Sequence, residues 1–204
     1  IKLFAQNLEP PVSAGITSDY GPRNLGGYDW HWGIDYGSGI GTDIHAVEEG
    51  DINLIRRYDT GGWCISIDGN SGYWYYFHLF SDSNNPRSGN WEAKSVYLVD
   101  PQTGQNNPNN QVYVFILWSN RADTIATKVL ASYRNTGRWV RWGNGYIKSV
   151  NGNRILTSGS VGSREVIGPS GNSGGNVPAH LHLACASISD APGRHIYDIN
   201  PLYY

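Results

Sequence analysis

Cysteine is scarce in this chain. The 204 residues include only Cys64 and Cys185. Two cysteines are too few for a disulfide scaffold, and these two lack the short spacing of a zinc ribbon. We expect them either to form one disulfide or to lie buried as thiols, so the fold must be stabilised mainly by a hydrophobic core.

Long hydrophobic runs and clusters of basic charge are also missing. No apolar run approaches the roughly 18 residues of a transmembrane helix. Lys and Arg number 15 against 17 Asp and Glu, and no stretch gathers the basic residues that would follow a phosphate backbone. We therefore expect no transmembrane segment and no nucleic-acid partner. The start, IKLFAQNLEPP, has neither a signal-peptide pattern nor a methionine, so we expect the sequence to begin either after a removed leader or at an artificial boundary.

Glycine, tryptophan and tyrosine are abundant instead. The chain contains 26 Gly, 8 Trp and 14 Tyr, a mixture that favours many short strands joined by tight turns. Helix-period patterns are scarce, and the length suits one domain of about 100–200 residues. The sequence predicts a mostly β protein over 1–204, with a compact antiparallel β-sheet core.

The middle of the chain, at about 81–150, differs in character from the rest. After a polar loop, the segments at 95–100 and 111–118 predict a hairpin. Both ends of this stretch lie between strands of one apparent sheet. We therefore expect an inserted hairpin and helix segment within the single domain, and not an independent domain.

A helix is predicted in the last part of this insertion. Ile125, Val129 and Tyr133 recur at four-residue spacing, Asp123 is a candidate N-cap, and Gly137 is a candidate stop.

His31 and Asp35 enclose a glycine in the stretch HWGID. On a strand, positions 31, 33 and 35 would share one face, and Gly33 would leave room for an ion and a substrate. Four extended steps span about 13 Å, which is too far for two side chains to share one ion easily. We therefore predict a bend at or before Gly33. The alternative is an ordinary surface hydrogen bond between His31 and Asp35.

His180 and His182 are two residues apart on a predicted strand, so both should point to one face, with Cα atoms about 7 Å apart. One can bind a metal while the other reaches the substrate, and Cys185 should point to the opposite face. Two histidines and one aspartate with an open fourth position are typical of a catalytic zinc site. His78, near the end of the aromatic strand YWYYFHLF, is a candidate further histidine that does not bind the metal. The alternative is a half-buried structural pair.

A serine nucleophile is a competing hypothesis. GNSGG at 171–175 is similar to the motif of trypsin-like proteases, and His45, Asp100 and Ser173 follow in the order of that triad. The residue before Ser173 is Asn, however, and no Ala-His-Cys surrounds His45, so the serine hypothesis is the weaker one.

Trp139 and Trp142 suggest a third class, a carbohydrate-binding module that stacks sugars on exposed rings. Burial of both rings would argue against it.

Seven motifs together resemble the lysostaphin-type, or beta-lytic, zinc metallopeptidases. In chain order they are SDYGPR at 18–23, HWGID at 31–35, GTDIHAVEEGDI at 41–52, YFHL at 76–79, IGPSGNSGG at 167–175, HLHLA at 180–184 and INPLYY at 199–204.

The resemblance implies a role for each matching residue. It implies that His31, Asp35 and His182 bind one zinc ion and that His78 and His180 are catalytic. It also implies a groove on a small antiparallel β core, hydrolysis of peptide bonds in bacterial cell-wall peptidoglycan, and a secreted or cell-envelope location.

The chain departs from the family pattern at three places. Asp43 replaces a proline, Ser173 replaces a threonine, and the insertion at 81–150 follows soon after His78. We expect the insertion to lie near the groove, either as a wall or as a cover. In the second case the protein would be a catalytically silent family member that binds or organises the cell wall.

Overall fold

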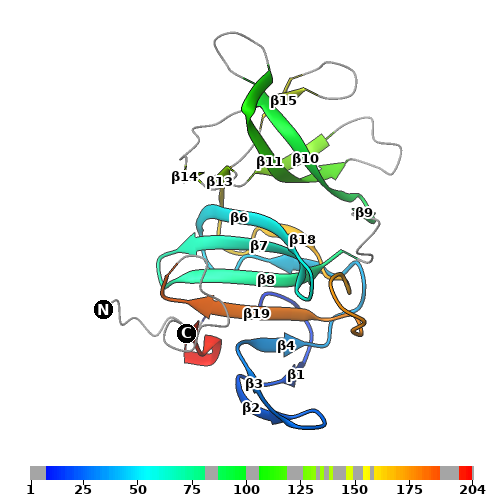
Figure 1. Cartoon of the computed structure of the whole chain (residues 1–204), viewed down its shortest axis with the longest axis vertical. Coiled ribbons are helices and arrows are strands. Elements are labelled where there is room, and N and C mark those ends of the chain that lie inside the picture. The colour runs from blue at the N-terminus through cyan, green and yellow to red at the C-terminus, as the bar shows by residue number, and fades with distance from the viewer. Residues whose placement is uncertain are drawn as a thin grey trace.

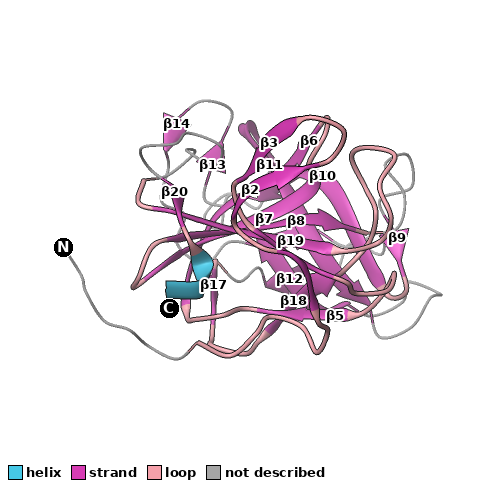
Figure 2. Cartoon of the chain, turned by 90° about the horizontal axis from the view of Figure 1, so that it is seen from below, coloured by secondary structure: helices cyan, strands magenta, loops and turns pink. Residues whose placement is uncertain are grey.

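The computed structural model of the chain describes residues 8–80, 87–99, 106–118, 126–131, 134–135, 138–139, 146–148, 154–156, 159–188 and 198–203. Strands dominate these residues, and the one helical element among them is the short 3₁₀ helix η1 (Pro201–Tyr203) near the C-terminus (Figure 2). None of the helical structure in this described part has the length and apolarity needed to cross a membrane.

The largest sheet has eight antiparallel strands and forms the centre of the molecule (Figure 1). In spatial order they are β1 (Ile16–Ser18), β4 (Ile34–Tyr36), β19 (Leu181–Ala186), β8 (Tyr73–Leu79), β7 (Gly62–Gly69), β6 (Gly50–Tyr58) and β17 (Ser160–Val161), with β20 (Asp198–Ile199) beside β19. The strands β6, β7 and β8 are consecutive in sequence, whereas β19 enters from the far end of the chain between β8 and β4. The sheet thereby brings the two terminal regions of the sequence together.

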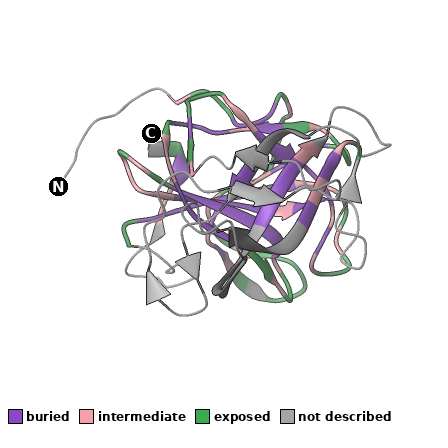
Figure 3. Cartoon of the chain, turned by 90° about the horizontal axis from the view of Figure 1, so that it is seen from above, coloured by how far each residue is buried: buried purple, intermediate pink, exposed green. Residues whose placement is uncertain are grey.

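Both faces of the central sheet are buried along β8, and Figure 3 shows buried strands, in purple, through the interior of the molecule. Trp74 and Tyr76 belong to the main hydrophobic cluster, whereas Tyr75 and Phe77 belong to a smaller cluster on the other face. Alternation of side chains along a strand produces this division. Each large aromatic side chain buried in this way contributes about 1.5–3 kcal/mol.

A second antiparallel sheet is built from the insertion and the residues after it. Its strands β10 and β11 lie above β6 in Figure 1. Its strands, in spatial order, are β12 (Ala126–Ala131), β11 (Asn106–Trp118), β10 (Trp91–Val99), β15 (Tyr146–Lys148) and β16 (Arg154–Leu156), with β9 (Arg87–Ser88) beside β10. The pairing of β10 with β11 confirms the predicted hairpin.

The two large sheets share one hydrophobic cluster. Phe115 on β11 is fully buried, and its ring lies 4.9 Å from that of Phe80 and 6.0 Å from that of Trp63, measured between centroids. Leu130 and Trp91 of the insertion belong to the same cluster. Whether the chain is one domain with an insertion stays a prediction, but the packing agrees with that organisation.

Three two-stranded sheets complete the described structure. They are β2 (Gly21–Asn24) with β3 (Tyr28–His31), β5 (Asp43–His45) with β18 (Val166–Pro169), and β13 (Arg134–Asn135) with β14 (Arg138–Trp139). The β2–β3 hairpin closes with the amide of Gly27 donating a hydrogen bond to Asn24 Oδ1, 3.1 Å away. It lies beside β4 and β1, at the bottom of Figure 1.

The predicted helix from Asp123 to Gly137 is wrong over its described residues. Residues 126–131 form strand β12, which pairs with β11 and places Leu130 opposite Phe115. The neighbouring strand provides hydrogen bonds, and β-branched residues such as Thr127 and Val129 suit a strand. Burial of Leu130 against the core then outweighs the four-residue spacing, which is a local signal only.

Cys64 and Cys185 are both buried and form no disulfide. The sequence left this choice open, and the structure shows no disulfide between them. Cys185 lies in the main core cluster, on the face opposite His182 as predicted.

Candidate metal centre and catalytic groove

The chain changes direction between His31 and Asp35. Strand β3 ends at His31 and pairs with β2, whereas β4 begins at Ile34 and pairs with β1 and β19. A Cβ atom at Gly33 would lie 2.7 Å from His182 Nε2 and would also overlap the Leu183 carbonyl. The predicted bend near Gly33 is therefore confirmed, and glycine is required there by close packing.

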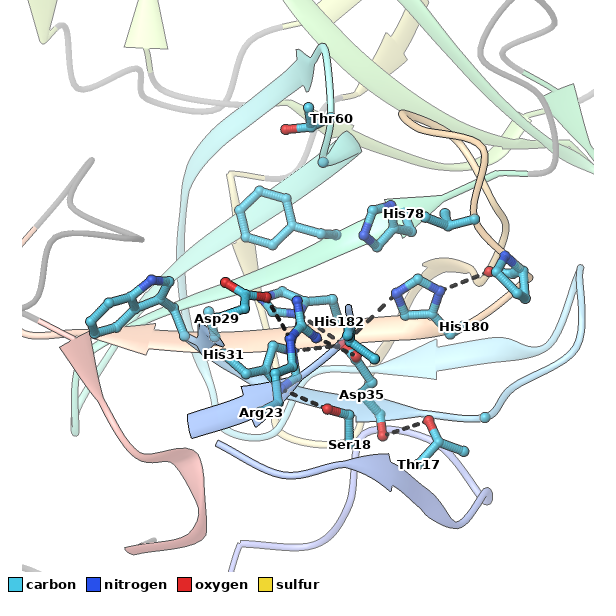
Figure 4. Close-up of a pocket in the computed structure, with 18 of the residues that line it drawn as sticks. Thr17, Ser18, Arg23, Asp29, His31, Asp35, Thr60, His78, His180 and His182 are labelled. Atoms are coloured by element: carbon cyan, nitrogen blue, oxygen red, sulfur yellow. Dashed lines mark hydrogen bonds and ion pairs between the residues drawn. The ribbon is translucent and has the colours of Figure 1, made fainter. Parts of the chain in front are cut away.

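Three polar side chains converge beside this bend (Figure 4). His31 Nε2 lies 3.1 Å from Asp35 Oδ1 and 3.0 Å from His182 Nδ1, and His182 Nδ1 lies 2.8 Å from Asp35 Oδ1. Within the described part of the chain, these are the three residues grouped closely enough to hold a metal ion together. His31 is almost fully buried, and the other two are partly buried.

The donor set fits zinc. Two imidazole nitrogens and one carboxylate oxygen are typical zinc ligands, and tetrahedral bonds of 2.0–2.1 Å separate ligand atoms by about 3.3 Å. The observed separations would need to open by only a few tenths of an ångström. In addition, His31 Nδ1 donates a hydrogen bond of 2.7 Å to the Asp19 carbonyl. This bond fixes the proton on Nδ1 and leaves the Nε2 lone pair facing the centre.

Two further histidines lie next to this group and share one tautomer. His78 Nδ1 donates to the Ser173 carbonyl and His180 Nδ1 donates to the Pro178 carbonyl, both at 2.8 Å. The two rings lie 4.4 Å apart between centroids, and His180 Nε2 is 3.8 Å from Asp35 Oδ1. Each ring therefore has its Nε2 atom available as a proton acceptor.

Burial favours the neutral form of two histidines of the site, His78 and His182. It lowers the pKa of His78 to about 4, although the hydrogen bond to Ser173 opposes this change. Burial also lowers the pKa of His182, against the opposing effect of Asp35. For Asp35 itself, burial alone would raise the pKa, but the adjacent His182 and His31 rings hold it well below its usual range. A carboxylate beside neutral imidazoles is the ionisation state that metal binding requires.

The five side chains lie in a groove with a volume of about 960 Å³. One wall is the β2–β3 hairpin, with Trp30 and Trp32 beside the histidines; the opposite wall comes from Thr60, Gly61 and the loop at 177–180. No described residue of the insertion at 81–150 lines this groove. The alternative in which the insertion covers the site thus finds no support in the described structure.

Arg23 is a groove residue that the sequence motifs contained but did not single out. Its Nε donates a hydrogen bond of 2.8 Å to Asp29 Oδ2, and its Nη1 lies 3.6 Å from Asp35 Oδ2. The bond to Arg23 lowers the pKa of the exposed Asp29 carboxyl. The guanidinium thus faces the oxygen of Asp35 that points away from the two imidazoles, a relationship that depends on strand pairing and was not visible in the sequence.

The serine hypothesis is not supported by the surroundings of Ser173. Its side chain is fully buried, and its Oγ accepts a hydrogen bond from the Trp63 amide and donates one to the Leu79 carbonyl. Asp100 and Trp142 lie outside the described residues, as does the side chain of Trp139. His45 donates from Nδ1 to the Arg164 carbonyl and does not line the groove.

Comparison with known proteins gives matches among solved structures alone. No protein-family model and no curated protein matches the sequence. An M23 peptidase from Pseudomonas aeruginosa aligns at 17% identity and a TM-score of 0.41, over 87% of this chain and 44% of its own. The catalytic domain of the antimicrobial peptidase lysostaphin from Staphylococcus simulans aligns at 17% identity and a TM-score of 0.49, over 93% and 90%.

A zinc-containing peptidase from Vibrio cholerae aligns at 17% identity and a TM-score of 0.44, over 86% of this chain and 35% of its own. The chain therefore spans less than half the length of two of these three proteins and nearly the whole of the lysostaphin domain. The solved structures similar to this chain include lysostaphin and M23 peptidases, which belong to the family that the sequence motifs resemble.

Proposed function

We propose that this chain is a zinc metalloendopeptidase that hydrolyses peptide bonds in bacterial cell-wall peptidoglycan. The observation that carries the proposal is the convergence of His31, Asp35 and His182 at separations of 2.8–3.1 Å. Two more imidazoles lie beside them in a groove. The peptidoglycan substrate and the secreted or cell-envelope location rest on the motif resemblance.

His31 Nε2, Asp35 Oδ1 and His182 Nδ1 would hold the ion. Bound there, zinc would lower the pKa of a coordinated water toward about 7 and polarise the scissile carbonyl. Asp35 supplies the negative charge of the ligand set, and its low pKa keeps it ionised throughout the physiological range.

His78 and His180 would carry the protons. Their Nδ1 protons are held by backbone carbonyls, so Nε2 of one ring can accept a proton from the attacking water. Once protonated, a ring can donate to the leaving amine or to the oxyanion. The two rings are close enough to act on the same bond, and either ring can take either role.

The proposal is tested on purified bacterial cell walls. The unchanged chain is expected to release new amino groups, and a chelator is expected to abolish that release until zinc is restored. His182→Ala should be inactive, whereas His45→Ala, which removes a histidine outside the groove, should retain activity. Mass spectrometry of products from walls of defined cross-link chemistry then identifies the bond that is cut.

Release that persists after chelation or in His182→Ala would contradict the proposal. Binding to walls without cleavage, at full zinc occupancy, would instead favour the catalytically silent wall-binding alternative.

A further inference from the structure

The segment that carries His78 has an unusual backbone. His78 has φ 57° and Phe80 has φ 67°, so two non-glycine residues at the end of β8 adopt the left-handed conformation. Left-handed backbone disfavours residues with a side chain, and it persists where surrounding contacts hold it. The contacts that hold this segment therefore decide where the His78 ring lies.

One residue of the loop at 171–174 bonds to every residue of this segment. The Ser173 carbonyl accepts from His78 Nδ1 at 2.8 Å, its Oγ donates to the Leu79 carbonyl at 2.5 Å, and its amide donates to the Phe80 carbonyl at 3.2 Å. The same Oγ accepts from the Trp63 amide at 2.8 Å. Ser173 thus joins β7 to the end of β8, and its hydroxyl both donates and accepts.

Packing leaves this serine no alternative position. Its side chain has no exposed surface, and a Cβ atom at the facing Gly62, which has φ 65°, would overlap the Ser173 carbonyl and hydroxyl oxygens. The close approach of the two backbones keeps the Ser173 carbonyl in place beneath the His78 ring. In Figure 4, His78 lies above His180, on the side of His180 away from Asp35.

We propose that Ser173 is a positioning residue for His78, an inference that rests on the proposed function. Its hydroxyl fixes the left-handed end of β8, and its carbonyl fixes the proton on His78 Nδ1. Together they present the unprotonated Nε2 of His78 to the groove. A displacement of about 1 Å in such a group can cost a hundredfold in rate.

The test compares Ser173→Ala with Ser170→Ala. Ser170 is a matched control because it is equally buried in the same part of the chain and its hydroxyl also donates to a backbone carbonyl, that of Gly39. We measure the proton–nitrogen spectrum of the His78 ring, zinc content, kcat and KM. In Ser173→Ala the Nδ1 proton of His78 should exchange rapidly and kcat should fall about 10- to 100-fold, with zinc content and KM unchanged. Ser170→Ala should preserve the ring signals and kcat.

A double variant separates positioning from a general loss of stability. In a His78→Gln background, Ser173→Ala should lower kcat little further, because residues that act as a unit are not additive. Ser173→Cys, whose thiol is a weaker donor and acceptor, should change the ring signals and kcat in the same direction by less. If Ser173→Ala does not fold, the Ser173→Cys variant still tests the proposal.

Unchanged His78 ring signals in Ser173→Ala, or equal kcat in the Ser173 and Ser170 variants, would overturn the positioning role. Absence of cleavage by the unchanged chain would instead contradict the proposed function, and the ring signals would still decide the role of Ser173.

Discussion

His182 on β19 lies directly opposite Asp35 on β4, and its Nδ1 is 2.8 Å from Asp35 Oδ1. The two residues are 147 positions apart in the sequence, so their approach depends on the register between two strands. A slip of one residue would turn His182 to the other face of the sheet. The candidate metal centre thus depends on strand pairing, and substitutions at several different residues should alter it.

Replacing Asp35 should remove the charged ligand of the centre. Asp35→Asn is expected to weaken zinc binding by at least about 10- to 100-fold, since even partners of metal ligands have effects of this size. Isothermal titration with zinc measures the change. Asp29→Asn is the matched control, because Asp29 bonds to Arg23 but lies outside the three-residue group. Equal zinc affinity in the two variants would contradict the assignment.

Gly33→Ala should destabilise the fold and distort His182. The added methyl would meet His182 Nε2 at 2.7 Å and the Leu183 carbonyl, and overpacking of this kind costs about 1–3 kcal/mol of unfolding free energy. Denaturant unfolding measures the loss. Gly15→Ala, where the methyl has no atom within 4 Å, should change stability little, and a similar loss in both variants would exclude the steric explanation.

Arg23 should influence zinc affinity through Asp35. Its Nη1 lies 3.6 Å from Asp35 Oδ2, so Arg23→Ala removes a cation that orients the carboxylate, and zinc affinity should fall about 10-fold. Arg57→Ala, at an exposed position of β6, is the control for loss of positive charge. Unchanged zinc affinity in Arg23→Ala would show that Asp35 is oriented by the histidines alone.

The metal-free protein should lose stability in mild acid, partly through His78. Burial lowers the pKa of His78 from 6.5 to about 4, so between these values the unfolded chain binds more protons than the folded chain. Stability therefore increases with pH in this interval, is fully present above about pH 6.5 and falls as the pH approaches 4. His78→Gln should reduce the slope of unfolding free energy against pH, whereas His45→Gln should preserve it. An unchanged slope in His78→Gln would contradict the shifted pKa.

Phe115 should stabilise the central sheet although it belongs to the insertion. Its fully buried ring packs on Phe80 and Trp63, so Phe115→Ala is expected to cost about 3–5 kcal/mol. Thermal unfolding should remain a single transition at a lower temperature. Leu25→Ala, which shortens a side chain that is 74% exposed, serves as the control. Two separate transitions in the unchanged chain would show that the insertion folds as a unit of its own.

Local patterns in the sequence were sufficient to predict the structural features that depend on neighbouring residues. Alternation along 180–186 separated the histidine face from Cys185. The length of four extended residues required the bend near Gly33. The five polar residues were named from the motifs, and their roles as ligands and catalysts stay predictions that the convergence supports.

Contacts between separate segments of the chain decided the features that local patterns could not predict. The stretch at 126–131 is a strand because β11 and the buried Phe115 lie beside it, which a spacing of apolar residues cannot reveal. Arg23 reaches Asp35 only after β2 and β3 fold against β4, and Ser173 reaches His78 only across two backbones packed at Gly62. Residue types and their order determined the β class and the candidate chemistry. Strand register and close packing determined which atoms meet, because they depend on contacts between separate strands and loops, such as the contact between His78 and Ser173, which are 95 positions apart.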